Sequence, residues 1–108
     1  MTRIIEIPAS FDDRTFDQFA GMFGEWPPAE RLLFDARAAQ WASPYGLIGI
    51  LTAAQALSEA GAERPIFTAP LNDDVKRYWA RTGFFRHAAD FFEIHGRIPK
   101  VAEGPSDT

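Results

Sequence analysis

Short runs of β-branched and aromatic residues alternate along the chain with longer segments in which apolar residues recur every three or four positions. Because β-branched and aromatic residues favour extended backbone, the runs predict strands at 3–7, 31–36 and 64–69. The periodic segments predict helices at 12–23, 44–60 and 72–82. A weaker run predicts a fourth strand at 91–94, with a helix over 87–95 as the alternative.

Each expected helix begins with a residue that can cap it. The side chains of Asp12, Ser43 and Asn72 are placed to accept free backbone N–H groups at the helix starts. The acid pairs at 12–13 and 73–74 therefore indicate capping and compensation of the helix dipole rather than catalytic carboxylates.

The order strand, helix, strand, helix, strand, helix predicts an α/β fold. We expect a small mixed, mostly parallel four-stranded sheet flanked by about three helices, which lie on one or both faces. The unbroken apolar run at 32–34 favours a strand that is covered on both faces. With 108 residues the chain forms one domain, which we place at 1–99, followed by a frayed tail at 100–108.

The chain carries 11 basic and 15 acidic residues, a net charge of −4 and no cysteine. The lack of cysteine excludes disulfides, thiolate metal sites and a cysteine nucleophile. The acidic balance argues against nonspecific binding of nucleic acid, which depends on cations that neutralise phosphates. No apolar run approaches the roughly 20 residues of a membrane span, and Glu6 interrupts the first one, unlike a signal peptide. We therefore expect a cytoplasmic protein that does not bind membranes.

Ligands of parallel sheets bind beyond the carboxyl ends of the strands, which directs attention to the segment 41–47. Ser43 and Gly46 lie there at a helix start, where free N–H groups and the positive end of the dipole favour an anion. Gly46 lowers helix propensity, which indicates close approach of another backbone, with simple capping and packing as the alternative. The segment lacks the Gly-Lys-Ser/Thr of a phosphate-binding loop, so nucleotide hydrolysis is not expected.

Fifteen aromatic residues are many for a core of this size. Trp26, Trp41 and Tyr45 fall in expected loops or at a helix start, and exposed aromatic residues are common anchors of protein interfaces. For Trp26 the alternative is that the segment 26–28 covers one end of the sheet.

A local basic patch lies between residues 75 and 87, and its four cations are Lys76, Arg77, Arg81 and Arg86. Three interpretations are open: a solvated helix face above buried aromatic residues such as Trp79 and Phe84, a surface for an acidic partner, or a site for single-stranded nucleic acid. The acidic balance of the whole chain weighs against nucleic acid.

Chemistry-bearing residues are sparse elsewhere. His87 and His95 make a poor metal-ligand set, so no metal site is expected. No Ser–His–Asp order or other enzyme motif is present, so we expect neither catalysis nor a cofactor. Asp35, at an expected strand end, can accept backbone N–H bonds or pair with Arg37.

The strand, loop and helix at 31–51 resemble the central segment of STAS domains, the fold of anti-sigma factor antagonists. Those domains carry a strand that ends in Asp and a loop with Asp-Ser-Ser/Thr-Gly-Leu that opens a helix. Asp35, Gly46 and Leu47 match this pattern, whereas Ser43 stands at the loop Asp and Tyr45 at the phosphorylated Ser or Thr. The family's phosphorylation switch therefore does not transfer to Tyr45, and Ser43 is the candidate for a phosphate.

The closer resemblance is to small STAS-like proteins with a similar segment at 75–85, which are found beside ATP-binding proteins of the histidine-kinase-like superfamily. It implies a non-catalytic regulatory module that docks such a partner protein. The expected contact residues are Trp41, Ser43, Tyr45, Gly46 and Leu47, with Asp35 and Arg37 in support. The alternative is a sensor that binds a small anion or nucleotide at the start of the 44–60 helix, and the oligomeric state stays open.

Overall fold

The computed structural model describes residues 2–100, without the side chains of residues 13 and 16. All but the first residue of the expected tail at 100–108 lies outside this range. The strands are β1 (Thr2–Glu6), β2 (Ser10–Phe11), β3 (Arg31–Asp35), β4 (Trp41–Ala42), β5 (Ile66–Thr68) and β6 (Glu93–His95). The helices are α1 (Asp13–Gly21), α2 (Pro44–Glu59), α3 (Asp73–Arg81) and α4 (Phe84–Ala88).

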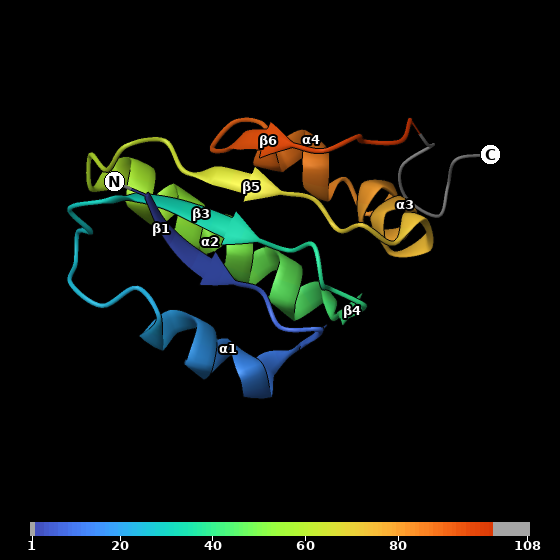
Figure 1. Ribbon diagram of the computed structural model, residues 1–108, viewed down its shortest axis with the longest axis horizontal. Helices are drawn as coiled ribbons and strands as arrows, with labels where there is room; N and C mark the ends of the chain where they lie inside the picture. The colour runs from blue at the N-terminus through green and yellow to red at the C-terminus, as the bar shows by residue number, and fades with distance from the viewer. Residues whose placement is uncertain (1, 101–108) are drawn as a thin grey trace.

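Four of these strands form one parallel sheet in the order β1-β3-β5-β6 (Figure 1). Each strand is added on the same side of the one before it, so right-handed crossovers put the connecting helices on one face. Helix α2 packs against both α1 and α4, and α4 packs against α3, which makes a single helical layer. The expected α/β fold is confirmed, with every strand pair of the sheet parallel and with four helices instead of three.

The expectation that the run 32–34 is covered on both faces is wrong. Leu32 and Phe34 are buried under the helical layer, whereas Leu33 lies on the opposite face and is half-buried. In the neighbouring strand Ile5 is fully buried and Ile4 is 60% exposed. The run is continuous in the sequence because an apolar row crosses the open face, with Ile4 opposite Leu33 and Leu33 opposite Ile66.

Aromatic rings fill the space between the sheet and the helical layer. The ring of Phe67 lies 5.4 Å from that of Phe84 and 5.3 Å from that of Phe92, and Trp79 lies 5.4 Å from Phe84. The expectation that Trp79 and Phe84 belong to the core is confirmed, since both are buried. Tyr78 is the half-exposed ring of the basic segment.

The three helix starts follow the sequence-based expectation. Asp12 Oδ1 accepts the N–H groups of Arg14 and Thr15, and Asn72 Oδ1 accepts those of Asp74 and Val75. Ser43 caps α2, as described below. Asp12 is thus a cap, and Asp73 and Asp74 lie in the first turn of α3, where they complement the helix dipole.

The chain departs from the expected elements in three places. Gly83, at φ 84°, separates α3 from the short helix α4, so the segment 87–95 is part helix and part strand. The fourth strand exists but begins at Glu93 rather than at residue 91. Residues 41–42, expected in a loop, form β4, which pairs with β2; two-residue strands carry no periodicity that the sequence could show.

Candidate functional site

The corner that leads from β4 into α2 is held by a small second sheet. Strand β4 pairs in parallel with β2, so that Trp41 lies opposite Ser10 and Ala42 opposite Phe11. The Trp41 N–H donates to the Ala9 carbonyl at 2.9 Å, and the Ser43 N–H donates to the Phe11 carbonyl at 2.9 Å. These bonds fix the backbone of the corner on both sides of the helix start.

Ser43 is the N-cap of α2. Its Oγ accepts the N–H of Gly46 at 3.1 Å, and its carbonyl accepts the N–H of Leu47 at 3.1 Å. Pro44, the first residue of α2, has no N–H group, and the N–H of Gly46 is already bonded to Ser43. Among the described residues of the first turn, this leaves the N–H of Tyr45 as the amide without an assigned hydrogen bond. The start of α2 therefore offers little to the small anion expected as an alternative ligand.

Gly46 is required by the close approach of another backbone, as the sequence indicated. A Cβ added to Gly46 would lie 2.8 Å from the Phe11 carbonyl oxygen and 2.7 Å from Phe11 Cδ2. The Phe11 carbonyl cannot easily withdraw because it accepts the Ser43 N–H. Gly46 thus lets α2 start directly against β2.

Three large side chains of this corner face solvent. Trp41 is 50% exposed, Tyr45 77% and Ile48 61%. Tyr45 and Ile48 are three positions apart and so share one side of α2. We call Trp41, Tyr45 and Ile48 the corner surface. Ile48 was not a sequence-based candidate, although its spacing from Tyr45 could have indicated it.

The other expected contact residues of the corner are less accessible. Ser43 is half-buried, whereas Gly46 and Leu47 are buried. Leu47 belongs to the hydrophobic core between α2 and the sheet. Gly46 and Leu47 therefore shape the corner from beneath and present no side chain on its surface.

Asp35 and Arg37 form a pair at the carboxyl end of β3. Arg37 Nε donates to Asp35 Oδ1, and a terminal guanidinium nitrogen donates to Oδ2, both at 3.0 Å. The Arg37 N–H also donates to Oδ1 at 3.0 Å. These bonds outweigh the partial burial of the carboxylate and lower the pKa of Asp35, while the same pairing raises the pKa of Arg37. Both expected roles of Asp35 are present, and they fix the loop that leaves β3.

A shallow hollow of about 290 Å³ lies next to this pair at the carboxyl ends of β1 and β3. Its lining residues are Glu6, Ile7, Asp35, Arg37, Ala38 and Leu71. The Leu71 N–H donates to the Arg37 carbonyl at 3.2 Å, which joins the loops after β3 and β5. With two acids and one paired arginine, the hollow does not suit an anion.

The remaining candidates lie away from the corner. Trp26 is half-exposed, with its ring 6.1 Å from that of Phe23, so one of its sides is covered. His95 Nε2 lies 2.5 Å from a Glu93 carboxylate oxygen, and His87 is exposed on α4. Among residues 2–100 no group of three or more potential metal ligands comes together. None of the helices described is long and apolar enough to cross a bilayer.

Comparisons with known proteins leave the function to be argued from the residues. No family model matches the chain, and neither curated proteins nor solved structures give a match.

Proposed function

We propose that the protein is a non-catalytic regulatory module that docks a partner protein through the corner surface of Trp41, Tyr45 and Ile48. The observation that carries the proposal is the exposure of these three side chains on a corner whose backbone is fixed by β2 and β4. Trp and Tyr are over-represented among the residues that dominate binding energy in protein interfaces. A fixed backbone lowers the entropy lost when such a surface binds.

The resemblance to STAS-like proteins supplies the expected partner, an ATP-binding protein of the histidine-kinase-like superfamily. The residues that carry this resemblance lie at the end of β3 and at the start of α2, next to the corner surface. Asp35 ends β3, Gly46 and Leu47 lie in the first turn of α2, and Tyr45 stands between the corner's cap and its buried residues. Docking at the start of α2 therefore agrees with both the exposed side chains and the motif.

Ser43 is the residue of this corner at which a charge would act. Its hydroxyl lies at the positive end of α2, where a phosphate, with about −1.5 to −2 charge, is favoured. Trp41 and Tyr45 flank it in the sequence, so the added charge would lie within the docking surface. We propose that phosphorylation of Ser43 changes the affinity for the partner.

The test is a binding titration with purified ATP-binding proteins of the histidine-kinase-like superfamily from the same organism. Trp41→Ala and Tyr45→Ala should each weaken binding by about 30-fold, the effect of removing an interface residue worth 2 kcal/mol. Tyr78→Ala is the matched control, because Tyr78 is a half-exposed aromatic residue on a different helix. No binding by the wild type would refute the partner, and equal binding by all variants would refute the surface.

The charge at Ser43 is tested in the same titration. Ser43→Asp keeps an N-cap and adds a negative charge, whereas Ser43→Asn keeps an N-cap without the charge. A difference in affinity between these two variants supports control by charge, and equal affinities would argue against it.

A further inference from the structure

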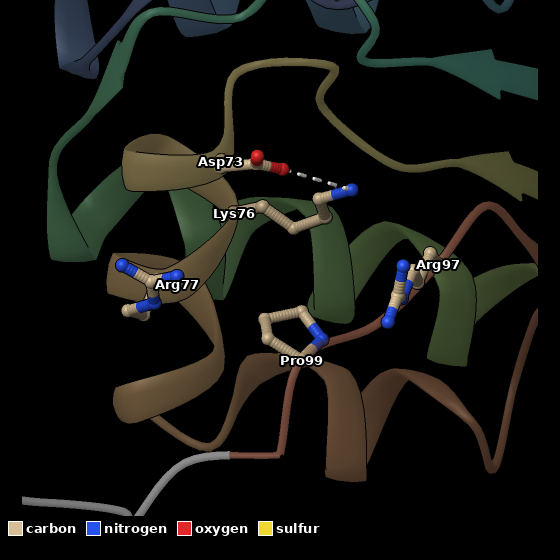
Figure 2. Close-up of a pocket in the computed structure, with 5 residues that line it drawn as sticks. All are labelled: Asp73, Lys76, Arg77, Arg97 and Pro99. Atoms are coloured by element: carbon tan, nitrogen blue, oxygen red, sulfur yellow. Dashed lines mark ion pairs between the residues drawn. The ribbon is translucent and has the colours of Figure 1, made fainter.

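We propose that a second site, separate from the corner surface, binds the phosphate group of a small phosphorylated ligand. It is a hollow of about 220 Å³ between α3 and the segment that follows β6 (Figure 2). Its lining residues are Asp73, Lys76, Arg77, Arg97 and Pro99. Three cations and one acid line it, in a chain whose net charge is −4; Arg77 also pairs with Asp74 of the same helix, at 3.9 Å.

The hollow lies where parallel sheets bind their ligands. Helix α3 follows β5, and Arg97 comes two residues after the end of β6, so the hollow is beyond the carboxyl ends of two neighbouring strands. Figure 2 shows Lys76 and Arg97 reaching toward the hollow from these two segments, with Pro99 beneath them and Arg77 farther along α3.

Lys76 is the best-enclosed cation of the hollow. Its side chain is only 12% exposed, which is low for a lysine. The nearest acid is Asp73, whose carboxylate lies 3.7 Å from the Lys76 ammonium nitrogen and is itself largely exposed. At that distance the pair is an ion pair without a short hydrogen bond. The ammonium therefore retains donors that an anion in the hollow could use.

Arg97 is held at the hollow without a partner of its own in the described chain. Gly96, at φ 113°, makes the turn after β6, and a Cβ there would lie 3.1 Å from Ala69 Cβ. This turn directs the chain so that Arg97 lines the hollow opposite α3. An unpaired guanidinium presents a planar fork of donors that matches the oxygens of a phosphate.

Size and charge together favour a phosphate group over a whole nucleotide. Pockets that enclose drug-sized ligands hold about 300–1,000 Å³, so a hollow of 220 Å³ takes the head of a ligand and leaves its remainder in solvent. Lys76 and Arg97 together offer more hydrogen-bond donors than a single carboxylate can use, whereas a phosphate monoester has three acceptor oxygens for them.

Sequence reasoning identified Lys76 and Arg77 as part of a basic patch but missed Arg97. The sequence left three interpretations of the patch open: a solvated helix face, a surface for an acidic partner, or a site for single-stranded nucleic acid. Arg97 lies far from Lys76 in the sequence, and only the pairing of β5 with β6 brings the two segments together.

The experiment is a titration of the full chain with inorganic phosphate, O-phosphoserine and AMP, followed by amide chemical shifts and by thermal unfolding at constant ionic strength. All three probes should shift the amides of Lys76 and Arg97 and raise the unfolding temperature. Acetate at the same ionic strength should do neither. Arg97→Gln and Lys76→Gln should each weaken binding by at least about tenfold, the effect of one hydrogen bond to a charged group.

The matched control is Arg81→Gln. Like Lys76→Gln, it removes one positive charge from α3, but Arg81 does not line the hollow. Arg97 is exposed, so Arg97→Gln tests the site even if Lys76→Gln disturbs folding. The proposal would be overturned if Arg81→Gln weakened phosphate binding as much as Arg97→Gln does. It would also be overturned if acetate gave the same response as phosphate. Binding of AMP without binding of inorganic phosphate would also overturn it. These outcomes leave the corner surface untouched, because they use no partner protein.

Discussion

Gly46 is a single residue on which the geometry of the corner depends. Gly46→Ala gains up to about 1 kcal/mol of helix propensity, but its Cβ would meet the Phe11 carbonyl at 2.8 Å. Because that carbonyl is held by Ser43, we expect overpacking to prevail and stability to fall by about 1–3 kcal/mol. Urea unfolding measures the change. Gly21→Ala is the control, since nothing lies within 4 Å of its added Cβ and no loss is expected there.

Ser43 contributes to stability through its hydroxyl as well as to the proposed regulation. Ser43→Ala removes the acceptor of the Gly46 N–H and should lower the free energy of unfolding by about 1 kcal/mol. Ser43→Asp restores an acceptor and adds a charge that the helix dipole favours, so it should unfold close to the wild type. Thermal unfolding in low salt compares the two. A loss as large for Ser43→Asp as for Ser43→Ala would contradict the capping role.

Asp35 links stability to pH. Its pKa in the folded protein is lowered, first by the hydrogen bonds from the Arg37 side chain, so the pair stabilises the fold above the unfolded pKa of about 3.9. This contribution is lost as the pH falls through the folded pKa. We expect Asp35→Asn to be less stable than the wild type at pH 7, with the difference narrowing below about pH 4. Urea unfolding across this range tests it.

Arg37→Gln provides the control for this pH dependence. In that background Asp35→Asn should cost less at pH 7, because the carboxylate has already lost its main partner. A pH-independent difference between Asp35→Asn and the wild type would contradict the linkage.

The helices and strands show which parts of this fold the sequence could predict. The caps Asp12, Ser43 and Asn72 were found because capping depends on residues a few positions apart. The close approach at Gly46 was indicated because glycine is disfavoured in a helix without such a reason. Local rules therefore predicted the order of the four strands of the main sheet with α1, α2 and α3, and the start of α2, but not β2, β4 or α4.

Features that depend on distant pairing could not be predicted in the same way. The run 32–34 favoured a strand covered on both faces. The sequence alone does not show whether an apolar residue such as Leu33 is fully buried or lies half-buried on an open face. The partnership of β4 with β2, which fixes the corner surface, joins segments about thirty residues apart. Arg97 meets Lys76 for the same kind of reason.

The one-sided helical layer gives the two faces of β1 very different roles. Ile5→Ala should cost about 2–5 kcal/mol, because its side chain is fully enclosed between the sheet and the helices. Ile4→Ala, on the open face, should cost much less, within about 1 kcal/mol. Urea unfolding of both variants at low protein concentration measures the difference. Equal losses of stability in the two variants would show that the open face is covered. Sedimentation at rising protein concentration would then show whether a second copy of the chain covers it.

The amino and carboxyl ends of the strands differ in how their arginines are bonded. At the amino ends, arginines bond to backbone carbonyls: Arg3 donates to Phe23 at 3.0 Å, and Arg31 donates to Arg64 at 2.7 Å. At the carboxyl ends, the corner surface is exposed and Arg97 has no partner in the described chain. The carboxyl ends also hold stabilising contacts such as the Asp35–Arg37 pair, but both proposed binding sites lie there, as is usual where loops beyond the carboxyl ends carry function.

A pair of arginine substitutions tests whether Arg64 stabilises the fold while Arg97 binds phosphate. Arg64 donates from one guanidinium nitrogen to the carbonyls of Ala89, at 2.5 Å, and Phe92, at 2.8 Å, and so ties the turn after α4 to the amino end of β5. Arg64→Gln should lower the free energy of unfolding by about 1–2 kcal/mol. This is less than the loss of a buried hydrogen bond to a charged group would cost, because the side chain of Arg64 is exposed. The substitution should leave the binding of phosphate unchanged. Arg97→Gln should do the reverse, weakening phosphate binding while unfolding at nearly the same urea concentration. If Arg97→Gln destabilised the fold as much as Arg64→Gln, then Arg97 would be a structural residue and the hollow beside it would not be a phosphate site.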